Sequence, residues 1–212
     1  MISVLTYNAP HRKTQDLLYM LKLSGYDDVT VFAIPWQERE NFKPLFKHRP
    51  SPMKIMPLRI CNALGYNFRE VKAHEEATGE QILIAGCGVI TPSPVIINSH
   101  PGYLPHGRGL DALKWAIYNN DPIGVTTYII GQECDTGMLI EQRLTPIYPT
   151  DDFYTIAMRH YELEITMLVD ALSLNITDKK LDNSRSVVHK RMPHDKELVI
   201  RERVKQIRHY ES

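Results

Sequence analysis

Two short apolar runs near the start of the chain place the strongest constraint on its fold. Ile2 to Tyr7 and Val29 to Ile34 are rich in β-branched residues and have the length of buried strands. Between them, apolar residues recur at helical spacing until Gly25, a residue that is common just past the end of a helix. A strand, a helix and a second buried strand within about 35 residues indicate a βαβ unit. The sequence therefore predicts an α/β fold with a parallel sheet that is covered on both faces.

The rest of the chain continues this alternation of strands and helices. Strands are predicted at 81–85, 95–97, 124–130 and 138–144. Helices are predicted at 58–64, 73–78, 111–119 and 153–172, with a final helix around 200–207. The proline-rich segment (35–57) contains five prolines among several basic residues, which predicts an irregular excursion rather than a long helix.

The composition argues against several functional classes. Lys and Arg number 25 and Asp and Glu number 25, so the net charge is zero, which disfavours wholesale binding of nucleic acid or of an anionic membrane. No apolar run approaches the roughly 18 residues of a membrane span, and the N-terminus lacks the pattern of a signal peptide. Cys61, Cys87 and Cys134 show no metal-ligand spacing and are interpreted as reduced thiols. We expect a cytoplasmic protein that binds no nucleic acid, no membrane and no metal.

The C-terminal part of the chain differs from the rest in its charge. From residue 179 onward, ten Lys and Arg face five Asp and Glu, and apolar residues at 200, 204 and 207 predict a helix that packs on the body. We divide the chain into a domain at 1–174 and a short, basic, partly helical extension at 175–212. The basic residues are interpreted either as a solvated face or as a site that faces phosphates.

The segment 98–109 is the most informative for function. It reads Asn-Ser-His-Pro-Gly-Tyr-Leu-Pro-His-Gly-Arg-Gly and directly follows an apolar strand, at the end where open α/β sheets bind ligands. Positions two apart in a strand share a face, so Asn98 and His100 are predicted to lie side by side. Asp135, in a loop between two later strands, would orient the imidazole and stabilise its charged form if it reached His100. A histidine at a strand end is more often structural, so both roles stay open on these residues alone.

The ordered set of motifs in this half of the chain resembles the folate-dependent formyltransferase family. The motifs are Asn98-x-His100-Pro-x-x-Leu-Pro, then Arg108-Gly109, then Gly124-Val-Thr-Thr-Tyr and Asp135-Thr-Gly. The resemblance is dense from about 81 to 142 and weaker over the first two strands. It implies a Rossmann-like formyltransferase fold with a mostly parallel central sheet flanked by helices, in which 1–174 is the catalytic domain.

The resemblance also implies the reaction and its catalytic residues. The family moves the formyl group of N10-formyltetrahydrofolate to an amine and needs no metal. Its catalytic Asn, His and Asp fall on Asn98, His100 and Asp135. Amide and imidazolium N–H groups are suited to stabilise the oxyanion of acyl transfer, and a carboxylate beside the imidazole keeps it oriented and charged.

Donor and acceptor contacts are carried over in the same way. The pterin of the donor is expected between two stretches of the chain, which are Gly86, Cys87, Gly88, Val89 and Ile90 on one side and Gly131, Gln132, Glu133 and Cys134 on the other. Contacts to the acceptor are expected from Arg108, Gly109, Arg12, Lys13 and Tyr103. Arg108 is equally well interpreted as a donor that stabilises its own loop.

Departures from the family pattern favour one kind of acceptor. The first turn, Asn8 to Lys13, lacks the glycine-rich phosphate loop of glycinamide ribonucleotide enzymes, and methionyl-tRNA enzymes are longer. The branch that fits is the sugar-nucleotide N-formyltransferases, which act on 4-amino (or 3-amino) dideoxy sugars linked to UDP, dTDP or GDP for surface glycans such as lipopolysaccharide, as in bacteria. Formylation of an amino acid or a carrier-bound aminoacyl group, and folate binding without catalysis, are the alternatives. A homodimer through the final helix or an edge strand is plausible.

Overall fold

The computed structural model describes residues 1–36, 43–87, 95–133, 135–182 and 186–207. In this part of the chain one sheet of seven strands has the order β3-β2-β1-β4-β5-β7-β8. The neighbours among β1 to β5 run parallel, whereas β7 is antiparallel to both β5 and β8. The bounds are β1 Ile2–Tyr7, β2 Val29–Ile34, β3 Asn67–Glu70, β4 Gln81–Ile84, β5 Ile96–His100, β7 Gly124–Ile130 and β8 Gly137–Leu144.

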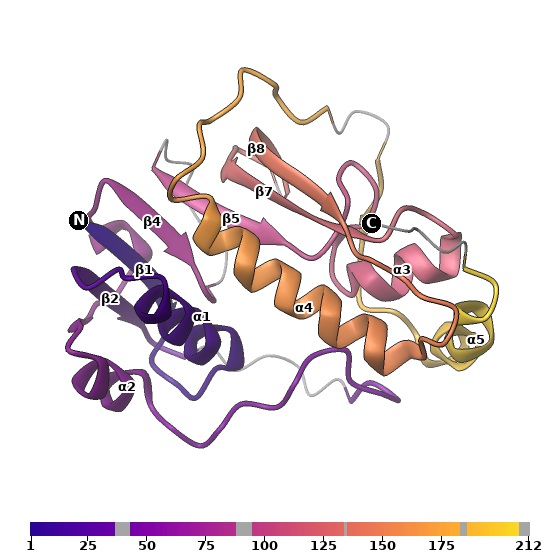
Figure 1. Cartoon of the computed structure of the whole chain (residues 1–212), viewed down its shortest axis with the longest axis horizontal. Coiled ribbons are helices and arrows are strands. Elements are labelled where there is room, and N and C mark those ends of the chain that lie inside the picture. Colours follow the sequence, from indigo (N-terminus) through magenta and orange to yellow (C-terminus); the bar gives the residue numbers. More distant parts are fainter. Residues whose placement is uncertain (37–42, 88–94, 134, 183–185, 208–212) are drawn as a thin grey trace.

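Helices pack against the sheet, and some of them lie beyond one of its ends. Their bounds are α1 Arg12–Leu23, α2 Pro57–Leu64, α3 Ala112–Asn119, α4 Phe153–Asp170 and α5 His194–Val204, with a single 3-10 turn, η1, at His74–Glu76. The long helix α4 crosses β5 and β7 and contacts α1, while α3 and α5 pack together near its start (Figure 1). The two-residue strands β6 (Arg108–Gly109) and β9 (Val188–His189) form a small second sheet. No helix in the described residues is long and apolar enough to cross a bilayer.

The core explains the unbroken apolar strands. Alternate residues of β1 point to opposite faces, so Val4 packs in the cluster beneath α1 and α4, whereas Leu5 packs in the cluster on the other face with Phe32. A strand that is buried on both faces needs apolar residues at every position, which is the pattern seen in β1 and β2. The prediction of a mostly parallel sheet flanked by helices is confirmed.

A further core joins the C-terminal extension to the body. Met192 and Ile200 are fully buried against Trp115 and the first turn of α4, which Asp152 caps by accepting from the N–H of Thr155. Within this core Lys114 of α3 donates to Glu197 of α5, and both side chains are fully buried. The extension is therefore held by apolar burial and by an ion pair without access to water.

Most predicted elements are present, and the differences have physical reasons. The helix predicted at 73–78 is only the single turn η1. None of the η1 residues is buried, so no burial of side chains stabilises a longer helix there. The edge strand β3 escaped prediction since its residues, Asn-Phe-Arg-Glu, lack an apolar alternation and are held by backbone pairing with β2. The strand predicted at 95–97 continues to His100, which matters for the site below. Within the proline-rich segment, residues 43–56 form no helix or strand and bend at several positions.

We expect the buried ion pair to be essential for stability. Glu197→Gln leaves the ammonium group of Lys114 buried without a counter-charge, and the free energy of unfolding should fall by about 3 kcal/mol. Glu202→Gln on the same helix removes an ion pair with Lys205 whose side chains are 71% exposed, and it should change little. Urea unfolding followed by circular dichroism compares the two variants, and equal losses would contradict the assignment.

Candidate active site

The pairing of β5 with β7 places three polar side chains together. Asn98 and His100 are two residues apart in β5 and so share a face. Tyr128 of β7 stands directly opposite Asn98, and opposed residues of neighbouring strands also share a face. The side-chain amide of Asn98 donates to the hydroxyl of Tyr128 at 3.1 Å. The predicted side-by-side arrangement of Asn98 and His100 is therefore produced by the sheet itself.

The loop between β7 and β8 brings Asp135 to the same place. Its φ of 52° lies in the left-handed region, which Asp tolerates better than most residues. Oδ1 lies 3.3 Å from Nδ1 of His100 and accepts from the hydroxyl of Tyr128 at 3.1 Å. The contact between Asp135 and His100 that the sequence raised as a hypothesis is present, and Tyr128 links it to Asn98.

A short turn holds both members of the His100–Asp135 pair. The carbonyl of Gly107 lies 2.8 Å from Nε2 of His100, and the backbone N–H of Gly109 donates to Oδ2 of Asp135 at 2.6 Å. A carbonyl and an ionised carboxylate can only accept, so the ring satisfies both neighbours when each of its nitrogens carries a proton. The geometry thus favours a charged imidazolium that is held at both ends.

Gly102 allows this close packing. A Cβ at this position would lie 2.8 Å from both the carbonyl oxygen of Gly107 and Nε2 of His100. Those distances are shorter than real Cβ contacts. Glycine at this position therefore lets the turn approach the imidazole.

A cavity of about 620 Å³ opens in front of these groups. Asn98, His100, Tyr128 and Asp135 all line it. Its walls include residues that sequence reasoning missed, namely Tyr7, His11, Trp36, Arg49, Ile84, Ile130, Glu164 and Arg191. The missed aromatic residues follow β1 and β2 at their carboxyl ends, where a ligand site in a parallel sheet is expected.

The residues proposed for the donor lie on two opposite stretches of this cavity, as far as they are described. Gly86 and Cys87 follow β4, and Gly131, Gln132 and Glu133 follow β7, and all five line the cavity. Gly88, Val89, Ile90 and Cys134 lie outside the described residues. Thr136 fixes the second stretch because its hydroxyl donates to the carbonyl of Glu133 at 2.9 Å and accepts from the N–H of Glu133 at 3.1 Å.

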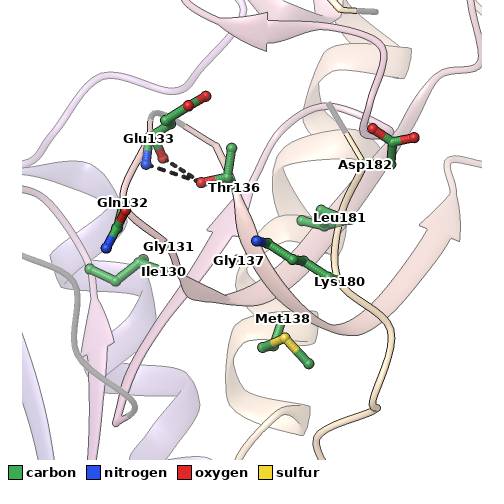
Figure 2. Close-up of a pocket in the computed structure, with 10 residues that line it drawn as sticks. All are labelled: Ile130, Gly131, Gln132, Glu133, Thr136, Gly137, Met138, Lys180, Leu181 and Asp182. Atoms are coloured by element: carbon green, nitrogen blue, oxygen red, sulfur yellow. Dashed lines mark hydrogen bonds between the residues drawn. The ribbon is translucent and has the colours of Figure 1, made fainter. Parts of the chain in front are cut away.

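The same loop borders a second cavity, of about 770 Å³. Figure 2 shows residues 130–133 and 136–138 on one side and Lys180, Leu181 and Asp182 of the extension on the other. The loop that carries Asp135 is thus solvent-accessible on a further face.

In the described residues no group of three or more His, Cys, Asp and Glu side chains is arranged to hold a metal ion.

The residues expected to contact the acceptor are spread over several places. Lys13 lines the cavity. Arg108 and Gly109 do not line it. Arg108 is buried, with its guanidinium donating to Ser186 at 3.2 Å, and Gly109 contributes the N–H that binds Asp135.

Arg12 and Tyr103 are not brought to the cavity either. Arg12 pairs with Asp16 at 2.7 Å on the outer side of α1 and lines a separate pocket. The ring of Tyr103 lies against Gly124. The structure therefore gathers Lys13 at the cavity but separates Arg12 and Tyr103 from it.

A buried ion network forms the floor of the cavity. Glu164 of α4 lies 2.8 Å from Nζ of Lys13 and 2.8 Å from the guanidinium of Arg49, and Lys13 also donates to the carbonyl of Ser99 at 3.1 Å. Burial opposes ionisation of Glu164, but Arg49 and Lys13 outweigh it and hold its pKa at about 2. Burial lowers the pKa of Lys13. The carboxylate therefore serves as the shared counter-charge of two cations that face the cavity.

A buried histidine of α4 contacts the backbone just after the end of β5. His160 of α4 lies 2.7 Å from the hydroxyl of Thr145 and 3.2 Å from the carbonyl of Pro101, the residue after His100. Burial lowers the pKa of His160 to about 4, so the ring is neutral near pH 7. A neutral ring here accepts from Thr145 and donates to Pro101.

The comparisons with known proteins agree on one family. A family model described as formyl transferase matches residues 65–172, which is about half of the chain. The methionyl-tRNA formyltransferase of Syntrophus aciditrophicus (strain SB) is 31% identical over 185 residues, which cover 82% of this chain and 58% of the relative. The chain spans about half the length of the curated relatives it matches over most of its residues.

Solved structures are similar in fold. A sugar N-formyltransferase from Shewanella sp. FDAARGOS_354 has a TM-score of 0.58 at 19% identity, covering 96% of this chain and 87% of the other. An N-formyltransferase from Helicobacter canadensis in complex with folinic acid and dTDP-3-aminofucose has a TM-score of 0.61 at 21% identity, covering 90% of this chain and 70% of the other. At these identities the likeness concerns the fold.

Acidification should destabilise the protein through His160. The unfolded chain protonates this imidazole near pH 6.5, whereas the folded chain resists protonation down to about pH 4, so the stability that depends on the neutral ring is lost as pH falls through this window. The contribution is about 3 kcal/mol. We expect His160→Gln to flatten the decline in the free energy of unfolding between pH 6.5 and 4, measured by urea unfolding. His106→Gln, at a half-exposed histidine, should leave the decline as it is, and an unchanged decline in both variants would refute the assignment.

Proposed function

Since the chain belongs to the formyl transferase family, we propose that it transfers the formyl group of N10-formyltetrahydrofolate to the amine of a nucleotide-linked amino sugar. The observation that carries the proposal is the joint arrangement of Asn98, His100 and Asp135 on one cavity. In this proposal residues 1–174 form the catalytic unit and residues 175–212 an extension of it.

Asn98 and His100 are proposed to stabilise negative charge on the formyl oxygen. The amide of Asn98 has a second N–H besides the one bound to Tyr128, and it is available to the reacting oxygen. The imidazolium of His100 adds a positive charge in a site where its side chain is only 7% exposed, and low exposure strengthens its effect. Both groups are fixed before substrate binds, which is the condition for effective stabilisation.

Asp135 is proposed to keep His100 charged and oriented. Its two oxygens accept from Tyr128 and from Gly109 while Oδ1 faces the ring, so the carboxylate is itself fixed. As the incoming amine forms its bond to the formyl carbon, it must lose a proton, and N10 of the folate must gain one as its own bond to that carbon breaks and tetrahydrofolate leaves. Asp135 lines the cavity and is the proposed acceptor of that proton, directly or through water.

The cavity suits the proposed donor in shape and chemistry. Ile84 and Ile130 offer apolar walls for a flat ring, and backbone groups at Gly86 and Gly131 offer hydrogen bonds to its edge. When bound, N10-formyltetrahydrofolate supplies the activated formyl group. The neighbour from Helicobacter canadensis carries folinic acid, which supports a folate in this fold.

The cations of the cavity support an anionic acceptor. Arg49 and Arg191 line it with 34% and 42% of their side chains exposed, and Lys13 lies deeper between them and the sheet. Guanidinium groups bind the phosphate oxygens of nucleoside diphosphates well because they donate in a planar fork. The nucleotide sugar bound to the Helicobacter canadensis protein supports the same class of acceptor here.

Methionyl-tRNA is the second candidate acceptor. It is favoured by the curated relatives, which are methionyl-tRNA formyltransferases at up to 31% identity over most of this chain. The net charge of zero speaks against it, because binding to a tRNA backbone depends on an excess of basic residues.

An acceptor panel tests the proposal. The protein is incubated with N10-formyltetrahydrofolate and with UDP-, dTDP- and GDP-linked amino sugars, methionyl-tRNA, free amino acids and carrier-bound aminoacyl groups, and mass spectrometry detects a product heavier by one CO unit. A product from an amino sugar supports the proposal, and a product from methionyl-tRNA alone replaces it with the second candidate. Binding of folate without any product would indicate a protein that binds folate without catalysis.

Catalytic variants should lose transfer without loss of fold. We expect His100→Ala and Asp135→Asn each to lower kcat by about 100-fold or more, because each removes preorganised stabilisation of the reacting oxygen. His106→Ala changes a histidine only six residues away whose side chain pairs with Asp121, and it should keep full activity. Circular dichroism confirms folding, and near-native turnover by either catalytic variant would overturn the assignment.

A further inference from the structure

The C-terminal extension runs beside the turn that holds the His100–Asp135 pair. We call residues 186–192 the C-terminal strap. Its strand β9 pairs in parallel with β6, with Gly109 opposite His189. The N–H of Leu110 donates to the carbonyl of His189 at 2.9 Å, and Arg108 donates to Ser186 at 3.2 Å. Every residue from 108 to 110 is therefore bonded to or paired with the strap.

Gly109 permits an unusually close approach of the strap. Its φ is +89°, and a Cβ at this position would lie 2.2 Å from the carbonyl oxygen of His189. The strap thus occupies the space where any other residue would carry its side chain. On its other side the same glycine presents its N–H to Asp135, so the strap directly backs the amide that holds the carboxylate.

Asp111 connects the turn to the strap a second time. It stands at the N-cap of α3, where Asp normally accepts from the first backbone N–H groups of its own helix, but its side chain makes no such bond. Instead Oδ1 lies 3.1 Å from the guanidinium of Arg191, and Oδ2 accepts from the N–H of Met192 at 3.0 Å. The side chain is 1% exposed, so both contacts are shielded from water.

Trp115 completes the attachment one turn further along α3. Its indole N–H donates to the carbonyl of Lys190 at 2.9 Å, and its ring stacks on His189 at a centroid distance of 4.4 Å. The strap is therefore bound along its whole length to the segment that follows the catalytic strand, and its place is fixed independently of any substrate.

We propose that Asp111 is a positioning residue, which acts through the strap to fix the turn 107–109 and thereby the His100–Asp135 pair. The turn supplies one acceptor to His100 and one donor to Asp135, so a shift of the turn displaces both groups together. The expected effect of Asp111 on kcat rests on the formyl transfer proposed above. Its effect on the position of the His100–Asp135 pair does not depend on that function.

Asp111→Asn tests the proposal in the full chain. Asp111 has a positive φ, which Asn tolerates as well as Asp does. The variant therefore changes the side-chain contacts to the strap without making the backbone conformation at position 111 less favourable. We expect kcat to fall about 10- to 100-fold, as misplacement of reacting groups predicts, with KM for the donor within about twofold of wild type. KM for the acceptor is not the control here, because Arg191, the partner of Asp111, lines the proposed acceptor side of the cavity. Glu202→Gln, an acid of the same extension that faces solvent, should match the wild type in both constants.

A spectroscopic readout separates positioning from general loss of structure. In protein with ¹⁵N-labelled histidine, the two ring nitrogens of His100 should both give signals of protonated, hydrogen-bonded nitrogen, and Asp111→Asn should shift both while the other histidines that are far from the strap keep theirs. This measurement needs no turnover. Shifted His100 signals in a protein that formylates none of the acceptors would uphold the positioning role and reject the proposed function.

Ser186→Ala supplies a second variant in case Asp111→Asn does not fold. It removes only the hydroxyl that binds Arg108, and we expect smaller changes in the same direction. Native His100 signals and native kcat in a folded Asp111→Asn protein, or in Ser186→Ala where Asp111→Asn is unfolded, would overturn the proposal.

Discussion

The antiparallel pairing of β7 with β5 is the constraint on which the rest of the site depends. Parallel strands alone would end their ladders at a common edge, and the chain would leave the sheet there. Here β7 continues the ladder alongside β5 up to His100, so that Asn98 and His100 are still strand residues with a fixed face. The same pairing places Tyr128 opposite Asn98 and starts the loop that returns Asp135 to the imidazole. The backbone ladder therefore sets the relative positions of all four side chains.

Charge compensation is the second organising feature. Beneath the strand end, one carboxylate, Glu164, is shared by Lys13 and Arg49, while Asp135 faces His100 above. A buried charge is tolerable only when its partner and its hydrogen bonds are in place. Glu164 stays ionised and is the shared partner of both basic side chains at the cavity wall. His160 is kept neutral by burial and adds no further charge to the floor.

Much of the fold could be predicted from the sequence, whereas the site could be predicted only in part. Strands and helices that bury one or both faces carry an apolar pattern, but β3 does not, since Phe68 alone packs on the core and the strand is otherwise held by its backbone pairing with β2. The adjacency of Asn98 and His100 follows from strand periodicity, and the place of Tyr128 follows only from the register between β5 and β7. Arg49 and Arg191 lie in segments without periodicity, so their arrival at the cavity depends on tertiary contacts that no local pattern encodes. Arg12, the first residue of α1, and Tyr103 lie away from the cavity, and the direction of each side chain likewise depends on tertiary packing.

The two irregular segments that supply these arginines depend on one another. Glu197 of the extension binds Lys114 and also accepts from the backbone N–H of Leu45 in the proline-rich segment at 2.9 Å, while Lys114 donates to the carbonyl of Phe46. One buried carboxylate thus fixes α5, α3 and the proline-rich segment in a single cluster. A change that moves either segment moves the other, and with it the proposed acceptor side of the cavity. Asn98 and His100, in contrast, are strand residues of the sheet, and the cluster is connected to them through Asp111 and the turn 107–109.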